Sequence, residues 1–310
     1  MFKKALLLGL LMMSMSSFTA WDKRYGGVDK SYDQSLLELR EQIAPEFQTL
    51  IFHDEKTGRE MTYSLYIPKN LKAGERYPLV QFIADASTVG KGAQAPLKQG
   101  YGAIIWATPE SQSAQPAFVF VPSFTERAVN DDFEHSEEVD IAHRLLQDLL
   151  KRYPIDEQRL YATGQSMGGM IAFYLNATYP DLFAASIYVG SQWDIRVLRP
   201  LLQQKFFYIV AASDDKASRG LAQVRAMLEE NKLAFDMTEL SAHAAPLAQQ
   251  NAAIEQLLRA GNAINLVTFS RSSVLPPADI ALKGAAEHMY SFDYAYQLKS
   301  VRDWLFKQHK

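Results

Sequence analysis

Six short apolar runs dominate the chain after Pro78 and constrain its fold more than any other feature. They are LVQFIA (79–84), AFVFVPS (117–123), RLYAT (159–163), AASIYVG (184–190), FFYIVAA (206–212) and INLVTFS (264–270). Near-continuous hydrophobicity is typical of strands in a parallel sheet that is covered on both faces. Segments with helical spacing lie between most of these runs or after the last one, at 139–150, 167–179, 221–228, 246–258 and 296–306. The alternation predicts a doubly wound, mostly parallel α/β sheet.

Two further β-rich runs, 47–54 and 60–68, precede Pro78 and are separated by the turn-like EKTG. They predict an antiparallel pair at the N-terminal edge of the sheet. No internal repeat or linker divides the rest of the chain. We therefore expect one domain over residues 47–310, preceded by a polar N-terminal arm over residues 21–46.

The first twenty residues, MFKKALLLGLLMMSMSSFTA, have the layout of a secretory signal peptide. Two lysines come first, an apolar stretch over 5–13 follows, and small polar residues come last. The apolar stretch is too short to span a bilayer stably. These features predict a leader over residues 1–20, a secreted or periplasmic protein, and no stable membrane insertion. Ala20 and Ser16 both remain candidates for the cleavage site.

Charge and cysteine content exclude several classes of function. The formal net charge of −3 argues against nucleic acid as a partner, because proteins that bind nucleic acids carry a basic surface. The chain has no cysteine, which excludes disulfides, a cysteine nucleophile and a thiolate metal site. The sequence indicates no cofactor and no metal.

The hexapeptide GQSMGG, residues 164–169, lies directly after one apolar run and before a helical segment. A G-x-S-x-G pattern in this setting is typical of a nucleophile elbow, a sharp turn that exposes a serine at the end of a strand. The helix that follows directs its N-terminal amides at the point where negative charge develops during acyl transfer. The pattern predicts Ser166 as a nucleophile, against the alternative of an ordinary strand-to-helix turn.

A serine nucleophile needs a base, and the base needs an orienting acid, in the chain order serine, acid, histidine. The acid is expected in SDDKAS, after a strong apolar strand. We favour Asp215, because Asp214 fits the turn itself, but both remain open. The base is expected at His288, between the last predicted strand and the last helix, with His243 as the alternative.

These motifs carry a family resemblance. The segments RLYATGQSMGGM, YPDLFAASIYVG and EHMYSFDYAYQLKSVRDWLF resemble secreted esterases of the α/β-hydrolase superfamily, the group that includes polyhydroxybutyrate depolymerases, feruloyl esterases and predicted prolyl-oligopeptidase-like peptidases. The resemblance covers residues 47–308. It implies an α/β-hydrolase fold, with Ser166 as nucleophile, Asp215 as acid and His288 as base. The final helix with its Trp304-Leu305 pair favours His288 over His243.

One loop departs from the family pattern. Where the family usually has a His-Gly loop, this chain has Ala84-Asp85-Ala86 after the first strand of the parallel sheet. By position, the backbone amides of Ala86 and Met167 would form the oxyanion hole. A carboxylate facing the oxyanion would oppose its charge, so we expect the side chain of Asp85 to turn away and bond neighbouring loop amides.

The substrate is only weakly encoded. Trp193 and Tyr290 are expected to line the cleft, and Phe292 and Phe124 are further candidates for aromatic walls. No long insertion forms a lid, which favours soluble esters over interfacial lipid. The leading expectation is a secreted serine carboxylesterase acting on small-molecule or carbohydrate-linked esters, including acyl or feruloyl esters. The alternatives are a serine peptidase for short peptides and a non-catalytic binding protein of the same fold.

Overall fold

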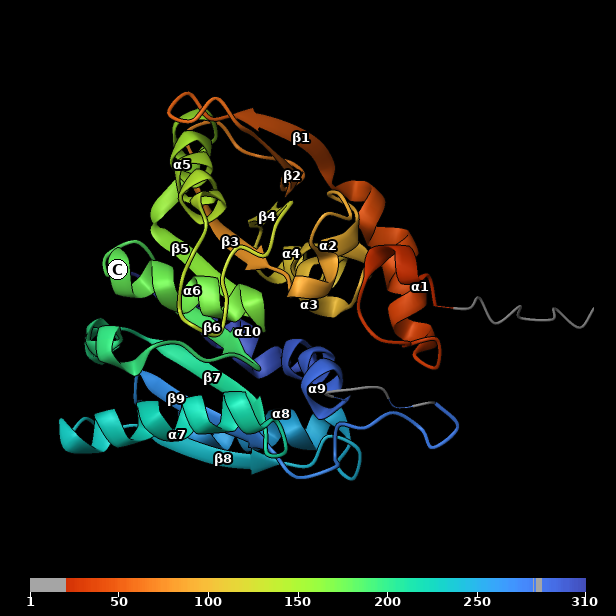
Figure 1. Ribbon diagram of the computed structural model, residues 1–310, viewed down its shortest axis with the longest axis vertical. Helices are drawn as coiled ribbons and strands as arrows, with labels where there is room; N and C mark the ends of the chain where they lie inside the picture. Colours follow the sequence, from red (N-terminus) through yellow and green to blue (C-terminus); the bar gives the residue numbers. More distant parts are fainter. Residues whose placement is uncertain (1–20, 281, 283–285) are drawn as a thin grey trace, which may run out of the picture.

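The computed structural model describes residues 21–280, 282 and 286–310, so the predicted leader over residues 1–20 lies outside the described residues. Its centre is a nine-stranded sheet in the order β1-β2-β4-β3-β5-β6-β7-β9-β8 (Figure 1). The strands are β1 (Gln48–His53), β2 (Glu60–Tyr66), β3 (Tyr77–Ile83), β4 (Phe118–Pro122), β5 (Ile155–Gln165), β6 (Ala185–Val189), β7 (Phe206–Ala211), β8 (Asp236–Leu240) and β9 (Ile264–Phe269).

The pairing of the strands confirms the predicted topology. Strands β1 and β2 pair antiparallel, and β2 pairs antiparallel with β4. Every other pair, from β4–β3 across to β9–β8, is parallel. The antiparallel pair therefore lies at one edge of a sheet that is otherwise parallel, as the sequence indicated.

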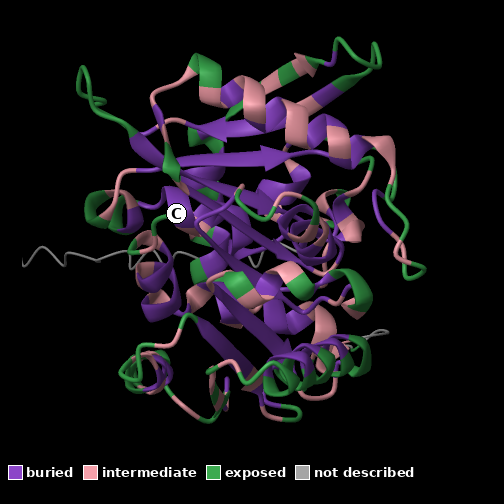
Figure 2. Ribbon diagram, turned by 90° about the vertical axis from the view of Figure 1, so that its left-hand side faces the viewer, coloured by how far each residue is buried: buried purple, intermediate pink, exposed green. Residues whose placement is uncertain are grey.

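Helices cover both faces of the sheet. They are α1 (Gln34–Ile43), α2 (Ala95–Lys98), α3 (Tyr101–Ile104), α4 (Pro109–Ala114), α5 (Glu137–Arg152), α6 (Met167–Thr178), α7 (Asp215–Glu230), α8 (Leu247–Leu258), α9 (Ala286–Gln297) and α10 (Lys299–Phe306). Helices α5, α6 and α7 pack into one apolar cluster, and α1, α3, α8, α9 and α10 pack into another. Figure 2 shows the strands buried between these layers.

Alternation along a strand explains why both clusters form. On β3, Leu79 and Ile83 belong to the cluster under α5, α6 and α7, whereas Val80 and Phe82 belong to the other cluster. Successive side chains of a strand point to opposite faces. A run of mostly apolar residues, which Gln81 alone interrupts in β3, is therefore what a sheet covered on both faces requires.

Helix α5 shows how the sequence directs local structure. Its buried positions, from Val139 to Leu149, recur at three- and four-residue spacing, with Glu137 and Glu138 in the first turn and Lys151 and Arg152 in the last. These charges complement the helix dipole. Ser136 occupies the predicted N-cap position, although its hydroxyl caps no amide.

Several elements differ from the sequence expectations. The predicted polar arm over residues 21–46 contains α1, which packs on α3 through its buried face. Strand β8 extends the sheet beyond β9, and the short helices α2 to α4 lie between β3 and β4; none of these was expected. The division into an arm and a domain over residues 47–310 stays a prediction. No helix among the described residues has the length and apolarity to cross a bilayer.

Candidate active site

Ser166 lies at the point where β5 ends and α6 begins. Its backbone has φ 51° and ψ −120°, a conformation that costs a non-glycine residue about 1–3 kcal/mol and persists only where the surroundings impose it. The surroundings here are two close approaches. A Cβ at Gly168 would lie 1.9 Å from the carbonyl oxygen of Ile83, and a Cβ at Gly164 would lie 2.4 Å from the backbone of Gly168. The glycines of the hexapeptide thus hold the strained turn against β3.

His288 lies beside Ser166. Its Nε2 is 2.9 Å from Ser166 Oγ, and its Nδ1 is in hydrogen-bond contact with Oδ2 of Asp214. The Ser166 hydroxyl makes no capping bond in α6, which leaves it to the histidine. His288 belongs to the first part of α9, not to a loop before the last helix as the sequence suggested. The three side chains come from the ends of β5, β7 and the segment after β9, at the carboxyl edge of the sheet.

The preference for Asp215 over Asp214 was wrong. Asp214 is the N-cap of α7, with Oδ1 accepting from the Ala217 amide at 3.3 Å while Oδ2 contacts His288. Asp215 is the first residue of α7, and its side chain is exposed. The position that the sequence assigned to the turn is the one that reaches the histidine, because an N-cap side chain folds back toward the helix end.

His243 is not among the described residues that line the pocket with Ser166. Its ring contacts the carbonyl oxygen of Leu275 and the hydroxyl of Tyr294. No hydrogen bond joins it to Ser166 or to either aspartate among the described residues. The structure therefore gives His243 no part in this constellation.

The two backbone amides expected to hold an oxyanion, those of Ala86 and Met167, belong to residues that line one pocket with Ser166 and His288. Met167 is the first residue of α6, and Ala86 is the first residue of a 3₁₀ turn, Ala86–Thr88. Within the described part of the chain, neither amide donates a hydrogen bond. Two free amides at helix N-termini beside a nucleophile are suited to hold a negatively charged oxygen.

Asp85 turns away from those amides, as expected. Its side chain is 2% exposed and accepts from the Ser87 amide at 2.8 Å. Its second oxygen accepts from Nε2 of Gln165 at 2.8 Å. Gln165 directly precedes the nucleophile, so this buried carboxylate links the Ala86 loop to the elbow.

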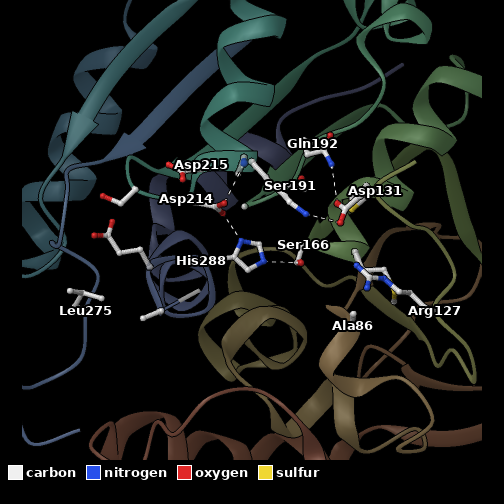
Figure 3. Close-up of a pocket in the computed structure, with 18 residues that line it drawn as sticks. Ala86, Arg127, Asp131, Ser166, Ser191, Gln192, Asp214, Asp215, Leu275 and His288 are labelled. Atoms are coloured by element: carbon white, nitrogen blue, oxygen red, sulfur yellow. Dashed lines mark hydrogen bonds and ion pairs between the residues drawn. The ribbon is translucent and has the colours of Figure 1, made fainter. Parts of the chain in front are cut away.

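The pocket around Ser166 has a volume of about 610 Å³. Figure 3 shows His288 and Asp214 on one side of Ser166, and Arg127 and Ala86 on the other. Besides the residues already described, its lining combines apolar side chains with a set of charged and polar ones: Arg127, Asp131, Ser191, Gln192, Ser213, Asp215, Lys216 and Glu287. None of the described residues that line it is aromatic.

The expected aromatic walls were therefore wrong. Trp193 is 3% exposed and packs edge-on against Phe133, with ring centroids 5.5 Å apart. Tyr290 is also 3% exposed and donates its hydroxyl to the carbonyl of Asp29 at 3.0 Å. Tyr290 lies two residues beyond His288 on α9, which turns it about 200° around the helix and away from the pocket.

Two more aromatic residues serve as packing rather than as walls. Phe292 is fully buried and lies edge-on to the His288 ring, 4.9 Å between centroids, where it supports the imidazole. Phe124 is buried in the cluster under α5, α6 and α7. Neither lines the pocket.

The polar lining was missed by sequence reasoning. Lys216 Nζ lies 2.6 Å from Asp131 Oδ2 and holds the pKa of that carboxyl below its ordinary value. Arg127 forms no ion pair within the described residues, so its charge faces the pocket unneutralised by direct contact. These residues come from the loop after β4 and from the start of α7, and no motif in the sequence brings them together.

Behind the pocket, burial raises the pKa of the Tyr208 phenol well above its ordinary value. Its hydroxyl donates to the carbonyl of Ser191 and so anchors the loop after β6. The hydroxyl of Ser191 itself is buried and lacks a hydrogen-bond partner among the described residues. Within those residues, no group of acidic and histidine side chains is arranged to hold a metal ion.

Comparisons with known proteins agree with this geometry. A family model described as "Putative esterase", of the Esterase family, matches residues 55–261. The fold is similar to a thermostable esterase, with a TM-score of 0.66 and 22% identity over 87% of this chain and 64% of that one. It is also similar to poly(aspartic acid) hydrolase-1 from Sphingomonas sp. KT-1, with a TM-score of 0.51 and 12% identity over 83% and 98% of the two chains. Among curated protein sequences, none matches this chain.

The thermostable esterase is longer, and this chain spans less than two thirds of it. Identities this low show a shared fold, whereas the family match covers most of the chain. The expected resemblance to esterases is thereby confirmed at the level of family and fold. The chain belongs to the Esterase family and has the α/β-hydrolase fold.

Proposed function

We propose that the protein hydrolyses carboxylic esters through an acyl-enzyme formed on Ser166, with His288 as base and Asp214 as orienting acid. The observation that carries this proposal is the 2.9 Å contact between Ser166 Oγ and His288 Nε2, with Asp214 on the opposite ring nitrogen. A carboxylate on Nδ1 holds the imidazole in the tautomer whose Nε2 can accept the serine proton.

The reaction proceeds in two balanced halves. Ser166 Oγ attacks the ester carbonyl carbon as its proton passes to His288 Nε2, and the carbonyl oxygen becomes an oxyanion. The amides of Met167 and Ala86 hold that oxygen. As the carbonyl re-forms, the bond from the carbonyl carbon to the alcohol oxygen breaks, and the leaving alcohol takes the proton from His288. Water then attacks the acyl-enzyme with His288 again as base, which releases the carboxylic acid and restores Ser166.

The buried position of Asp85 supports this use of the Ala86 loop. Both of its carboxylate oxygens are engaged, one by the Ser87 amide and one by Gln165. Its negative charge is thus directed into the loop and away from the amides of Ala86 and Met167. The missing His-Gly pair does not remove the oxyanion hole, since the donors are backbone groups.

The pocket offers several groups that can bind the polar part of a substrate. Charged and hydroxyl-bearing side chains lie among the residues around Ser166, and no aromatic ring lines the space in the described part of the chain. We therefore infer a short acyl ester of a hydroxyl-rich alcohol, such as an acetylated carbohydrate, in preference to a feruloyl ester. The leader-like residues 1–20 support export, so the proposed place of action is outside the cytoplasm.

Kinetics on a panel of esters tests the proposal. We expect the wild-type protein to cleave p-nitrophenyl acetate and acetylated sugars faster than feruloylated sugars, and to cleave aminoacyl p-nitroanilides poorly. A fluorophosphonate probe should label Ser166, and Ser166→Ala should lose both labelling and turnover. A folded wild-type protein that neither turns over esters nor takes the label would refute the proposal.

Arg127 offers a second test within the same pocket. It is the cation without a direct carboxylate partner among the described lining residues, and it lies across Ser166 from His288 (Figure 3). Arg127→Gln should lower kcat/KM for an ester that carries a carboxylate by about 5- to 10-fold relative to its neutral analogue, as expected for one exposed charge pair. An equal effect on both esters would show that Arg127 does not recognise the carboxylate of the substrate.

A further inference from the structure

A stretch of five residues, Gly26–Lys30, lies between the N-terminal 3₁₀ turn Lys23–Tyr25 and α1. It is outside the family match, which begins at residue 55, and it contributes no residue to the pocket lining. It nevertheless contacts the two segments that carry the oxyanion amide and the base. These are the Ala86 loop and helix α9.

The contact with the Ala86 loop is close. The Gly27 amide donates to Oγ of Ser87 at 2.7 Å. Gly26 has φ +76°, and a Cβ at Gly26 would lie 2.3 Å from the carbonyl oxygen of Ser87. The backbone of the stretch therefore rests directly on the residue next to Ala86, at a distance that only glycine permits.

From Ser87 a path of hydrogen bonds leads to the nucleophile. The Ser87 amide donates to Asp85, and Asp85 accepts from the side chain of Gln165, each at 2.8 Å. Gln165 is bonded through the chain to Ser166. Asp85 and Gln165 are each 2% exposed, so water does not compete with these bonds.

The contact with helix α9 is a buried ion pair. Lys30 is 2% exposed, and its Nζ lies 2.7 Å from Oδ2 of Asp293 on α9. The same ammonium donates to the carbonyl of Gln99 at 2.8 Å. One turn nearer His288, Tyr290 donates its hydroxyl to the carbonyl of Asp29 at 3.0 Å.

A buried ion pair contributes little net stability, because the loss of hydration offsets the attraction between the charges. It does fix geometry, since each charge requires its partner at one position. The stretch therefore has two attachments within five residues of chain: the hydrogen bond to Ser87 and the ion pair to α9. The stretch thus contacts both the loop that holds the oxyanion amide and the helix that holds the base.

We propose that Gly26–Lys30 is a positioning element of the active site, which holds the Ala86 amide and His288 in register across Ser166. This inference rests on the proposed esterase function. Its residues touch no substrate and act through Ser87 and Asp293. Displacement of a reacting group by about 1 Å can cost 10²-fold in rate, so loss of the element should lower turnover more than it lowers substrate binding.

Glycine variants give a matched test at the loop end. Gly26→Ala adds a Cβ against the Ser87 carbonyl, whereas Gly58→Ala adds one at φ +71° with no atom within 4 Å. Both variants carry the strain of a positive φ, but only the first displaces the stretch. For p-nitrophenyl acetate we expect kcat to fall 10- to 100-fold in Gly26→Ala with KM changed less than 3-fold, and both constants to stay within 2-fold in Gly58→Ala.

A boronic acid provides a readout that a merely structural role would not move. It forms a tetrahedral anion on the serine, so its inhibition constant reports the oxyanion amides. The constant should rise about 10-fold in Gly26→Ala and stay unchanged in Gly58→Ala. An unchanged constant and kcat in folded Gly26→Ala would overturn the proposal.

Lys30→Gln tests the helix end and guards against a Gly26 variant that fails to fold. The substitution shortens the side chain and removes its positive charge, so the ion pair to Asp293 on α9 is lost. We therefore expect kcat to fall about 10-fold while the melting temperature stays above the assay temperature. Arg144→Gln, which breaks the ion pair of a partly exposed arginine to the buried Asp54 and lies outside the pocket lining, is the control and should lower stability alone. Should Lys30→Gln likewise lower stability alone, the positioning role is wrong. An inactive wild-type protein would instead count against the esterase function.

Discussion

Asp214→Asn is the sharpest test of the site, because the structure and the sequence pattern favour different aspartates. The Asp214 side chain is 7% exposed, and its two oxygens serve the α7 cap and His288. An asparagine can keep an oxygen on the Ala217 amide. Its NH₂ group then faces His288 Nδ1, which forces the ring proton onto Nε2. A protonated Nε2 can no longer accept the proton of Ser166.

The expected magnitude follows from what is lost. The substitution removes both the correct tautomer and the negative charge that stabilises the imidazolium, a change that lowers turnover by about 10³- to 10⁴-fold in a serine triad. This equals about 4 to 5 kcal/mol of transition-state stabilisation. Asp215 is exposed and makes no contact with His288, so Asp215→Asn should change kcat less than about 2-fold.

The assay measures kcat on p-nitrophenyl acetate for both variants, with circular dichroism to show that each is folded. Because the cap oxygen is retained in Asp214→Asn, its melting temperature should stay close to that of the wild type. The reasoning fails if Asp214→Asn keeps more than about a tenth of wild-type turnover, or if Asp215→Asn shows the 10³-fold loss expected of the triad acid.

Three further outcomes are expected. His288→Ala should abolish turnover while His243→Ala leaves it intact, as measured with the same ester; the reverse result would reassign the base. Gly168→Ala should yield a protein that unfolds at lower urea concentration or fails to fold. Its Cβ would lie 1.9 Å from a β3 carbonyl oxygen, and this oxygen belongs to the backbone and cannot move aside as a flexible side chain could. Wild-type stability would contradict the close packing of the elbow. The Arg144 guanidinium lowers the pKa of Asp54 to about 2 from its ordinary 3.8, so its stabilisation is present above that ordinary value and is lost as pH falls toward 2. Arg144→Gln should therefore cost at most about 2 kcal/mol near neutral pH and progressively less in acid, in urea titrations at several pH values; a cost that does not change with pH would refute this linkage.

Much of the fold could be predicted from the sequence because the signals are local and strong. Continuous apolar runs identify the strands of the parallel sheet, and the spacing over 139–150 identifies α5 at Glu137–Arg152. Strand β8, DMTEL, was missed because it is an edge strand with a polar face, and its Met237 is 43% exposed. Its place in the sheet depends on pairing with β9, which no local pattern reveals.

The candidate site likewise has features that the sequence predicted and features that it did not. The elbow around Ser166 combines a strand, a glycine-flanked turn and a helix within about twenty residues of chain, so a local pattern was sufficient. The choice between Asp214 and Asp215 depends on where α7 begins, and the apolar spacing indicated a start at 221 instead of Asp215. The direction of Tyr290 depends on His288 being helical, which the sequence did not indicate.

The order of the strands also bears on how the protein gains its activity during folding. Strands β7 and β9 are neighbours although β8 and α8 lie between them in the chain. His288 is 74 residues from Asp214 and 122 residues from Ser166. Contacts across such separations carry a large loop-closure entropy and form after local structure. Recovery of ester cleavage after dilution from denaturant should therefore lag recovery of helical circular dichroism, which makes catalysis the more stringent measure of a completed fold.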